Sequence, residues 1–171
     1  MTRLVVDADI LGILQRAEGL ASIAALTAPP WVITDEIWYE VTDNAAASGA
    51  YPSSVEEMRE FLAAIAGSPT VIEPMSPEAA ALAKLSAPPV KEDPGELSVI
   101  AYAYHHPDTI AVLHDRAAVF RGIEELRGRV ISIHGLLGLL RADHGLAATD
   151  TQRISDHYCK RHAPIRSPLW W

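Results

Sequence analysis

Short apolar runs alternate with amphipathic stretches along this chain, a pattern typical of parallel strands joined by helices. The apolar runs predict strands at residues 3–6, 31–34, 70–72, 109–113 and 130–133. Helical spacing between them predicts helices at residues 8–17, 35–46, 53–66, 77–85, 97–105, 115–126 and 135–142. We therefore expect an α/β fold, a single three-layer domain whose central parallel sheet of about five strands is covered by helices on both faces.

The proline-rich stretch at residues 86–92 is expected to be a loop within this domain, because the strand–helix pattern resumes directly after it. Residues 1–145 carry the whole alternating pattern and form the expected domain. Residues 146–171 are expected to add a C-terminal helix and tail of unknown role.

Composition favours one compact domain in a reducing compartment. The chain has 171 residues, of which 49% are hydrophobic, so it can bury a sizeable core. Its single cysteine, Cys159, cannot form an internal disulfide. No apolar stretch approaches the roughly 18 residues that a membrane span needs, and Asp7 and Asp9 interrupt the apolar N-terminal segment. We expect a soluble, cytoplasmic protein that does not bind membranes.

Charge is distributed unevenly along the chain. The net charge is −8, but residues 151–171 carry four basic residues against one acid and so contribute +3, which leaves −11 on the rest. An acidic body repels nucleic acid, so a nucleic-acid substrate would need a basic strip or a bound metal ion. Arginines near residues 116–129 and the basic tail, which ends in Trp170 and Trp171, are candidates for such a strip. The alternative for the tail is that it docks on the chain's own body or on a second subunit.

Four acidic residues follow or flank the predicted strands: Asp7, Glu40, Glu96 and Asp115. Ligand sites of open α/β sheets lie beyond the carboxyl ends of the strands, so we expect these carboxylates to converge there. An all-oxygen set of ligands suits Mg²⁺ or Mn²⁺. The pattern therefore predicts metal-assisted phosphoryl chemistry.

Helix capping is the competing explanation for most of these acids. Asp7 and Asp115 stand at N-cap positions, and Asp93 with Glu96 fits a capping box. Glu40 lies inside a predicted helix and is not a cap. Clustered carboxylates repel one another and cost stability unless a cation or a proton neutralises them, which favours a functional role for the set.

In order and spacing these motifs resemble the PIN-domain nucleases, in particular the subgroup with a Gly-Glu motif at the third acidic position. The motifs are residues 4–7 (LVVD), 32–34 (VIT) leading to 38–41 (WYEV), 95–103 (GELSVIAYA), 112–118 (VLHDRAA) and 135–140 (GLLGLL). The resemblance implies a PIN-like fold and a Mg²⁺- or Mn²⁺-dependent endoribonuclease. Its catalytic and metal-binding residues would be Asp7, Glu40, Glu96 and Asp115. It also raises the possibility of a toxin paired with an antitoxin protein, and of a homodimer.

Four positions depart from the family pattern or leave its assignment open. His114 stands where similar proteins often have a first aspartate, and Asp9 where they more often have Ser, Thr or Asn. Glu36 competes with Glu40 for the second acidic position. Arg116 is a candidate phosphate contact or an ion-pair partner of a pocket acid.

Two other classes of function remain open on the sequence alone. Asp7 and Asp9 after the first strand are similar to the aspartate pair of haloacid-dehalogenase-like phosphatases. A catalytically silent PIN-like binding protein, whose acids only cap helices, is the second alternative. The seven histidines lack the spacing of a zinc site, so catalytic zinc is not expected.

Overall fold

The computed structural model describes residues 2–26, 30–86 and 93–161. Within them a parallel sheet has the strand order β2-β1-β3-β4. These strands are β1 (Arg3–Val6), β2 (Trp31–Val32), β3 (Thr109–Val112) and β4 (Val130–Ile131). Register is set by pairs such as Val6 with Val112. Leu4, Val5 and Val6 are fully buried, as expected for a central strand covered on both faces.

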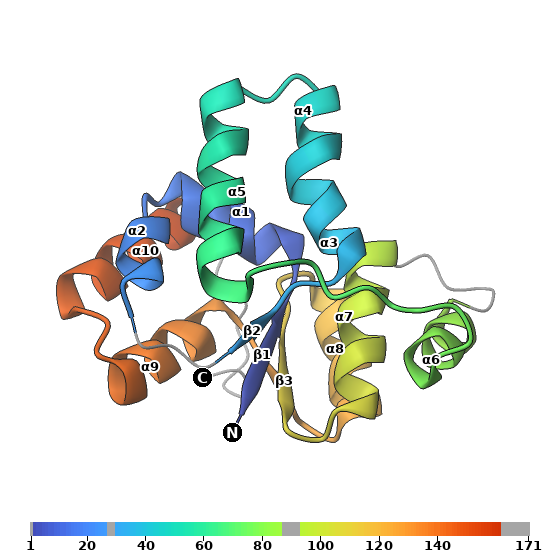
Figure 1. Cartoon of the computed structure of the whole chain (residues 1–171). Helices are drawn as coiled ribbons and strands as arrows, with labels where there is room; N and C mark the ends of the chain where they lie inside the picture. The colour runs from blue at the N-terminus through green and yellow to red at the C-terminus, as the bar shows by residue number, and fades with distance from the viewer. Residues whose placement is uncertain (1, 27–29, 87–92, 162–171) are drawn as a thin grey trace.

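Helices cover both faces of the sheet, so the expected three-layer α/β architecture is confirmed (Figure 1). One layer contains α1 (Ala8–Arg16), α2 (Leu20–Ala24), α9 (Ile133–His144) and α10 (Ala148–Arg161). The other contains α7 (Pro94–His105) and α8 (Arg116–Leu126), with α6 (Pro77–Leu85) packed outside α7.

A helical hairpin stands beyond the carboxyl ends of the strands (Figure 1). Its first arm runs through α3 (Asp35–Tyr39), the π-helix η1 (Glu40–Asn44) and α4 (Ala45–Ala47), and its second arm is α5 (Pro52–Ala66). The sequence predicted this first arm as one α-helix and gave no sign of the π-helical turn. Such turns are rare and are often found at functional sites.

The expected sheet of about five strands is wrong by one strand in the described part of the chain. Predicted strand 70–72 is reduced to a single parallel bridge between Thr70 and Thr34. The bridge cannot extend, because the partner segment turns into α3 at Asp35. Val71 is 53% exposed, so this Val-Ile pair has high β-propensity but no sheet face to cover.

The fourth and last strand is shorter than predicted. Expected as residues 130–133, β4 ends at Ile131 because the Ser132 side chain accepts a hydrogen bond from the Gly135 N–H and begins α9.

Helix α2 was not predicted. Of the expected loop at 86–92, all but Ser86 lies outside the described residues, as do the tail residues Arg166, Trp170 and Trp171.

The C-terminal helix expected after residue 145 is present as α10, and it is part of the body. Ile154 and Tyr158 of α10 are buried, and the helix packs against α1 and α9. No helix in the described ranges combines the length and apolar character that crossing a membrane requires.

Candidate functional site

Asp7 is the most constrained acid of the molecule. It follows β1 directly, and its backbone N–H donates to the Val112 carbonyl of β3, which places it between the two central strands. Its side chain is only 3% exposed, and Oδ2 has no hydrogen-bond partner among the described residues. Although it occupies the N-cap position of α1, its carboxylate makes no capping bond, so capping does not explain this residue.

The surroundings of the Asp7 carboxyl disfavour its charged form. Burial, followed by repulsion from Glu96, Asp9 and Glu40, raises its pKa to about 8. A backbone hydrogen bond from Ala8 acts in the opposite direction, but it does not replace the hydration that the buried carboxylate loses. Binding of a proton or a cation would therefore stabilise the Asp7 carboxylate.

Glu96 is a second buried acid, in the first turn of α7. Burial and the nearby Asp115 and Asp93 carboxylates raise its pKa to about 7, while the Asp93 backbone N–H acts in the opposite direction. This N–H contact is half of the expected capping box. The Asp93 side chain caps the helix through the Gly95 N–H, at 2.8 Å, rather than through the Glu96 N–H of a full capping box. Glu96 thus has the capping role that the sequence predicted and also belongs to the acidic cluster.

A buried pair of hydroxyl groups fixes this turn of α7 against the end of β2. Thr34 Oγ1 and Ser98 Oγ lie 2.7 Å apart, and Ser98 Oγ donates to the Gly95 carbonyl at 2.6 Å. Thr34 also caps α3 by accepting from the Ile37 N–H. The starts of α3 and α7 are therefore tied together, which sets the position of Glu96 relative to Glu40.

Glu40 is the first residue of the π-helix η1, and its side chain extends to the start of α7. A Cβ at Gly95 would lie 2.9 Å from Glu40 Oε2 and 3.1 Å from Asp93 Oδ1, so both carboxylates crowd the bare Cα of Gly95. Burial and repulsion from Asp93, Asp9 and Glu36 raise the pKa of Glu40. Glu40, and not Glu36, is among the acids that raise the pKa of Asp7, so the geometry favours Glu40 as the second acid.

Asp115 is exposed at the start of α8, and we place it at the rim of the cluster. It caps α8, because its Oδ1 accepts from the Ala117 and Ala118 N–H groups at 2.7 and 3.3 Å. Its negative charge also raises the pKa of Glu96. The predicted capping role is therefore confirmed, and it coexists with a place beside the buried acids.

Arg116 and His114, the neighbours of Asp115 in the sequence, contact aromatic rings. The Arg116 guanidinium carbon lies 5.5 Å from the centroid of the Phe120 ring, and among the described residues no ion pair joins Arg116 to a cluster acid. The His114 ring packs edge-on against Tyr158 of α10, with centroids 5.7 Å apart. His114 thus anchors the strand end to α10.

The structure adds one acid that sequence reasoning had assigned only to capping. Asp93 raises the pKa of both Glu40 and Glu96, and Asp9, an open question from the sequence, raises the pKa of Asp7, Glu40 and Glu96. Both side chains are exposed. The signal for Asp93 was present in the sequence, since it lies three residues before Glu96 and at the same helix start.

Together these acids form what we call the acidic cluster: Asp7, Asp9, Glu40, Asp93, Glu96 and Asp115. Carboxylate oxygens suit a hard divalent cation, and the unpartnered Oδ2 of Asp7 provides a buried donor for one. No three His, Cys, Asp or Glu side chains of the described ranges are close enough together to enclose a metal ion. The one buried, unpartnered carboxylate oxygen of Asp7 fits an ion with few direct protein ligands that keeps much of its water, as Mg²⁺ does.

Comparisons of the chain with protein-family models, with curated proteins and with solved structures found no match. The PIN-like character of the chain thus stays a prediction from its motifs.

Proposed function

We propose that this protein is a metal-dependent endoribonuclease that hydrolyses RNA phosphodiester bonds with Mg²⁺ or Mn²⁺ at the acidic cluster. The observation that carries the proposal is Asp7, a carboxylate that is 3% exposed and lies at the carboxyl end of a central strand with one oxygen unpartnered. Neighbouring carboxylates add repulsion to this burial. Such an arrangement lowers stability and is understandable where a cation completes it.

Asp7 and Glu40 would bind the ion directly, and Glu96, with Asp115 at the rim beside it, would contact the water that the ion keeps. When bound, the ion would lower the pKa of coordinated water and neutralise charge that develops on the phosphate. The protein's own contribution is to place several carboxylates at one strand edge and to fix two of them through the Thr34–Ser98 contact.

Glu96 also suits proton transfer. In the metal-free protein its pKa is raised to about 7, and a bound cation would lower it, so that the carboxylate form is present to act as a base. In the proposed reaction the Glu96 carboxylate accepts the proton of the attacking water while the water oxygen bonds to phosphorus and the bond from phosphorus to the leaving ribose oxygen breaks.

RNA is proposed as the substrate from the motif resemblance, and a phosphodiester is the class of substrate that the cluster fits chemically. The phosphatase alternative would require Asp7 itself to become phosphorylated. Incubation with acetyl phosphate and Mg²⁺ separates the two functions, since the nuclease proposal predicts no aspartyl-phosphate at Asp7.

The test of the proposal compares wild type with Asp7→Asn, Asp115→Asn and Glu96→Gln. Each change removes a charge and keeps hydrogen-bonding capacity, so all three variants should fold. We expect Mn²⁺ to raise the melting temperature of wild type and to support cleavage of single-stranded RNA. The variants should lose most of both effects, Glu96→Gln less than the others.

Asp143→Asn is the matched control, because Asp143 is an exposed acid on α9 away from the cluster. It should behave as wild type. The proposal is refuted if wild type shows neither a Mn²⁺-dependent thermal shift nor metal-dependent cleavage, or if the three cluster variants keep both in full.

A further inference from the structure

A second surface, which contains basic side chains, lies at the other end of α1. It is a pocket between the C-terminal end of α1 and one face of α10, which we call the α1–α10 pocket. Its basic lining residues are Arg16, Arg153 and Lys160, and its acidic ones are Glu18 and Asp156. In a chain with a net charge of −8, this concentration of basic residues stands out.

Arg153 is occupied by a structural role. Its guanidinium donates to the Ala17 carbonyl and, at 2.7 Å, to the Asp150 carboxylate. These bonds join α10 to the residue that ends α1. Arg153 therefore builds the pocket and is not available for a ligand.

Arg16 and Lys160, in contrast, are exposed, and neither makes a hydrogen bond or ion pair with another described residue. The guanidinium of Arg16 folds back along α1: a Cβ at Gly12 would lie 3.0 Å from its Nη1. The bare Cα of Gly12 thus leaves room for the Arg16 side chain, which turns toward the end of α1 that bears Asp7 and Asp9.

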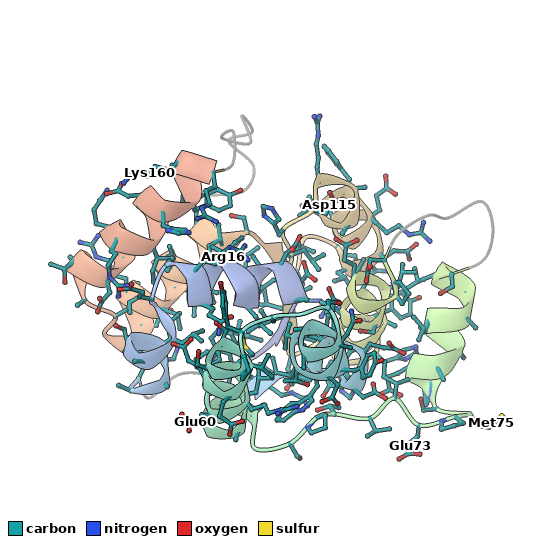
Figure 2. All side chains as sticks on the ribbon, turned by 90° about the horizontal axis from the view of Figure 1, so that it is seen from above. Arg16, Glu60, Glu73, Met75, Asp115 and Lys160 are labelled. Carbon is teal, nitrogen blue, oxygen red and sulfur yellow. The ribbon has the colours of Figure 1, made fainter. Side chains whose placement is uncertain are left out.

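Helix α1 connects this pocket to the acidic cluster. Its rise of about 1.5 Å per residue puts Gly12 about 8 Å and Arg16 about 14 Å along the helix axis from Asp7. At about 3.4 Å per nucleotide this corresponds to roughly two to four nucleotides of a stacked strand. Figure 2 shows Lys160 and Asp115 on opposite sides of the view, with Arg16 between them.

We propose that Arg16 and Lys160 bind backbone phosphates of the RNA strand, with Arg16 two to four nucleotides from the phosphodiester at the acidic cluster. This inference rests on the proposed function and adds how an acidic protein retains a polyanion. The cluster attracts the strand only through its cation, so basic contacts beside it supply affinity and set the direction of the strand. Asp156, whose Oδ1 accepts from the Gln152 amide at 2.8 Å, and Glu18 are the acids of the lining that oppose this charge.

The experiment measures binding of a fluorescein-labelled 12-nucleotide single-stranded RNA by anisotropy, in Ca²⁺ and over a series of salt concentrations. Arg16→Ala and Lys160→Ala should each weaken binding several-fold, and each should reduce the slope of log K against log salt by about 0.7. Glu18→Gln removes an acid from the same lining and should tighten binding. Arg141→Ala, an exposed arginine of α9 outside the pocket, is the charge-matched control and should leave the slope unchanged.

The Mn²⁺-dependent thermal shift is recorded for the same proteins, which separates the two proposals. Pocket variants that keep the wild-type affinity and salt slope overturn the pocket proposal, even if their thermal shift is intact. Variants that lose RNA affinity and keep the Mn²⁺ shift support it. A wild type that does not bind the RNA overturns the pocket proposal whatever its Mn²⁺ shift, whereas loss of the Mn²⁺ shift alone counts against the metal site.

Discussion

Asp7 illustrates how a single residue can lower the stability of a fold while defining its chemistry. Full burial and three neighbouring acids raise its pKa to about 8, compared with an ordinary value near 3.8. Between these two values the folded protein holds a proton at Asp7 that the unfolded chain has released. The free energy of unfolding of the metal-free protein therefore falls as the pH rises through this window.

Asp7→Asn should remove this dependence. At pH 8 the metal-free variant should melt about 3–6 °C above wild type, which corresponds to about 1–2 kcal/mol for a protein of this size. Below pH 3.8, where Asp7 is protonated in the folded and the unfolded chain alike and resembles Asn in charge, the two proteins should melt together. Calorimetric scans at both pH values check this result. A variant that is less stable than wild type at pH 8 would show that the Asp7 charge is already compensated within the fold.

Glu40 and Glu36 provide a second comparison at the scale of single residues. Glu40 crowds Gly95 and raises the pKa of Asp7, whereas Glu36 is exposed and affects the cluster only through Glu40. Glu40→Gln should therefore weaken Mn²⁺ binding on the order of tenfold, because it removes a ligand charge. Glu36→Gln should change it by no more than about twofold. Titration of the thermal shift with Mn²⁺ measures both, and equal effects would reopen the choice of second acid.

At the scale of elements, the first turn of α7 organises the site. Gly95 allows Glu40 and Asp93 to approach its backbone, and the Ser98–Thr34 contact holds this turn against the start of α3. The π-helical turn begins at Glu40, so this residue is presented by irregular helix rather than by a regular α-helix. The acidic cluster therefore depends on close packing between two helix starts.

Gly95→Ala tests this dependence against a matched glycine. Alanine is favoured over glycine in a helix by about 1 kcal/mol, but here its methyl group would meet Glu40 Oε2 and Ile37 Cδ1 at 2.9 Å. We expect no gain in melting temperature and a weaker Mn²⁺ response. Gly138 of α9 has no atom within 4 Å of the added Cβ, so Gly138→Ala should raise the melting temperature and leave the Mn²⁺ response intact. Identical behaviour of the two variants would contradict the packing argument.

Hydrophobic periodicity was enough to predict most elements, and local competition explains where it failed. Strands β1 and β3 and the helix after Asp115 follow directly from apolar runs and a capping residue. Segment 70–72 has strand propensity, but its partner enters α3 after one bridge. The π-helical turn arises within a continuous helical pattern and has no period of its own in the sequence.

For the site, the sequence predicted which residue types matter but not how they divide their roles. Strand-end positions identified Asp7 and Asp115 equally, yet Asp115 is an exposed cap and Asp7 a buried carboxylate that caps nothing. That difference depends on the packing of helices around β1, which spacing does not report. Arg16 was not singled out because the α10 residues beside it come from a distant segment of the chain, whereas Asp93 was assigned only to capping although Glu96 lies three residues away.

At the scale of the whole molecule, charge is arranged in two zones along α1. The acidic cluster lies at its N-terminal end and the α1–α10 pocket at its C-terminal end. A protein with a net charge of −8 would repel RNA, so we infer that the bound cation and the pocket together make binding possible.

Proton release on metal binding tests the central claim most directly, because it reports the ion and the acids in one experiment. Mn²⁺ is titrated into the protein at pH 7 by isothermal calorimetry, in two buffers that differ in ionisation enthalpy. With pKa values of about 8 for Asp7 and about 7 for Glu96, the metal-free cluster is partly protonated at this pH, so binding should release about one proton. Asp7→Asn should bind more weakly and release less. Absence of Mn²⁺ binding, or binding whose heat is the same in both buffers, would contradict the account.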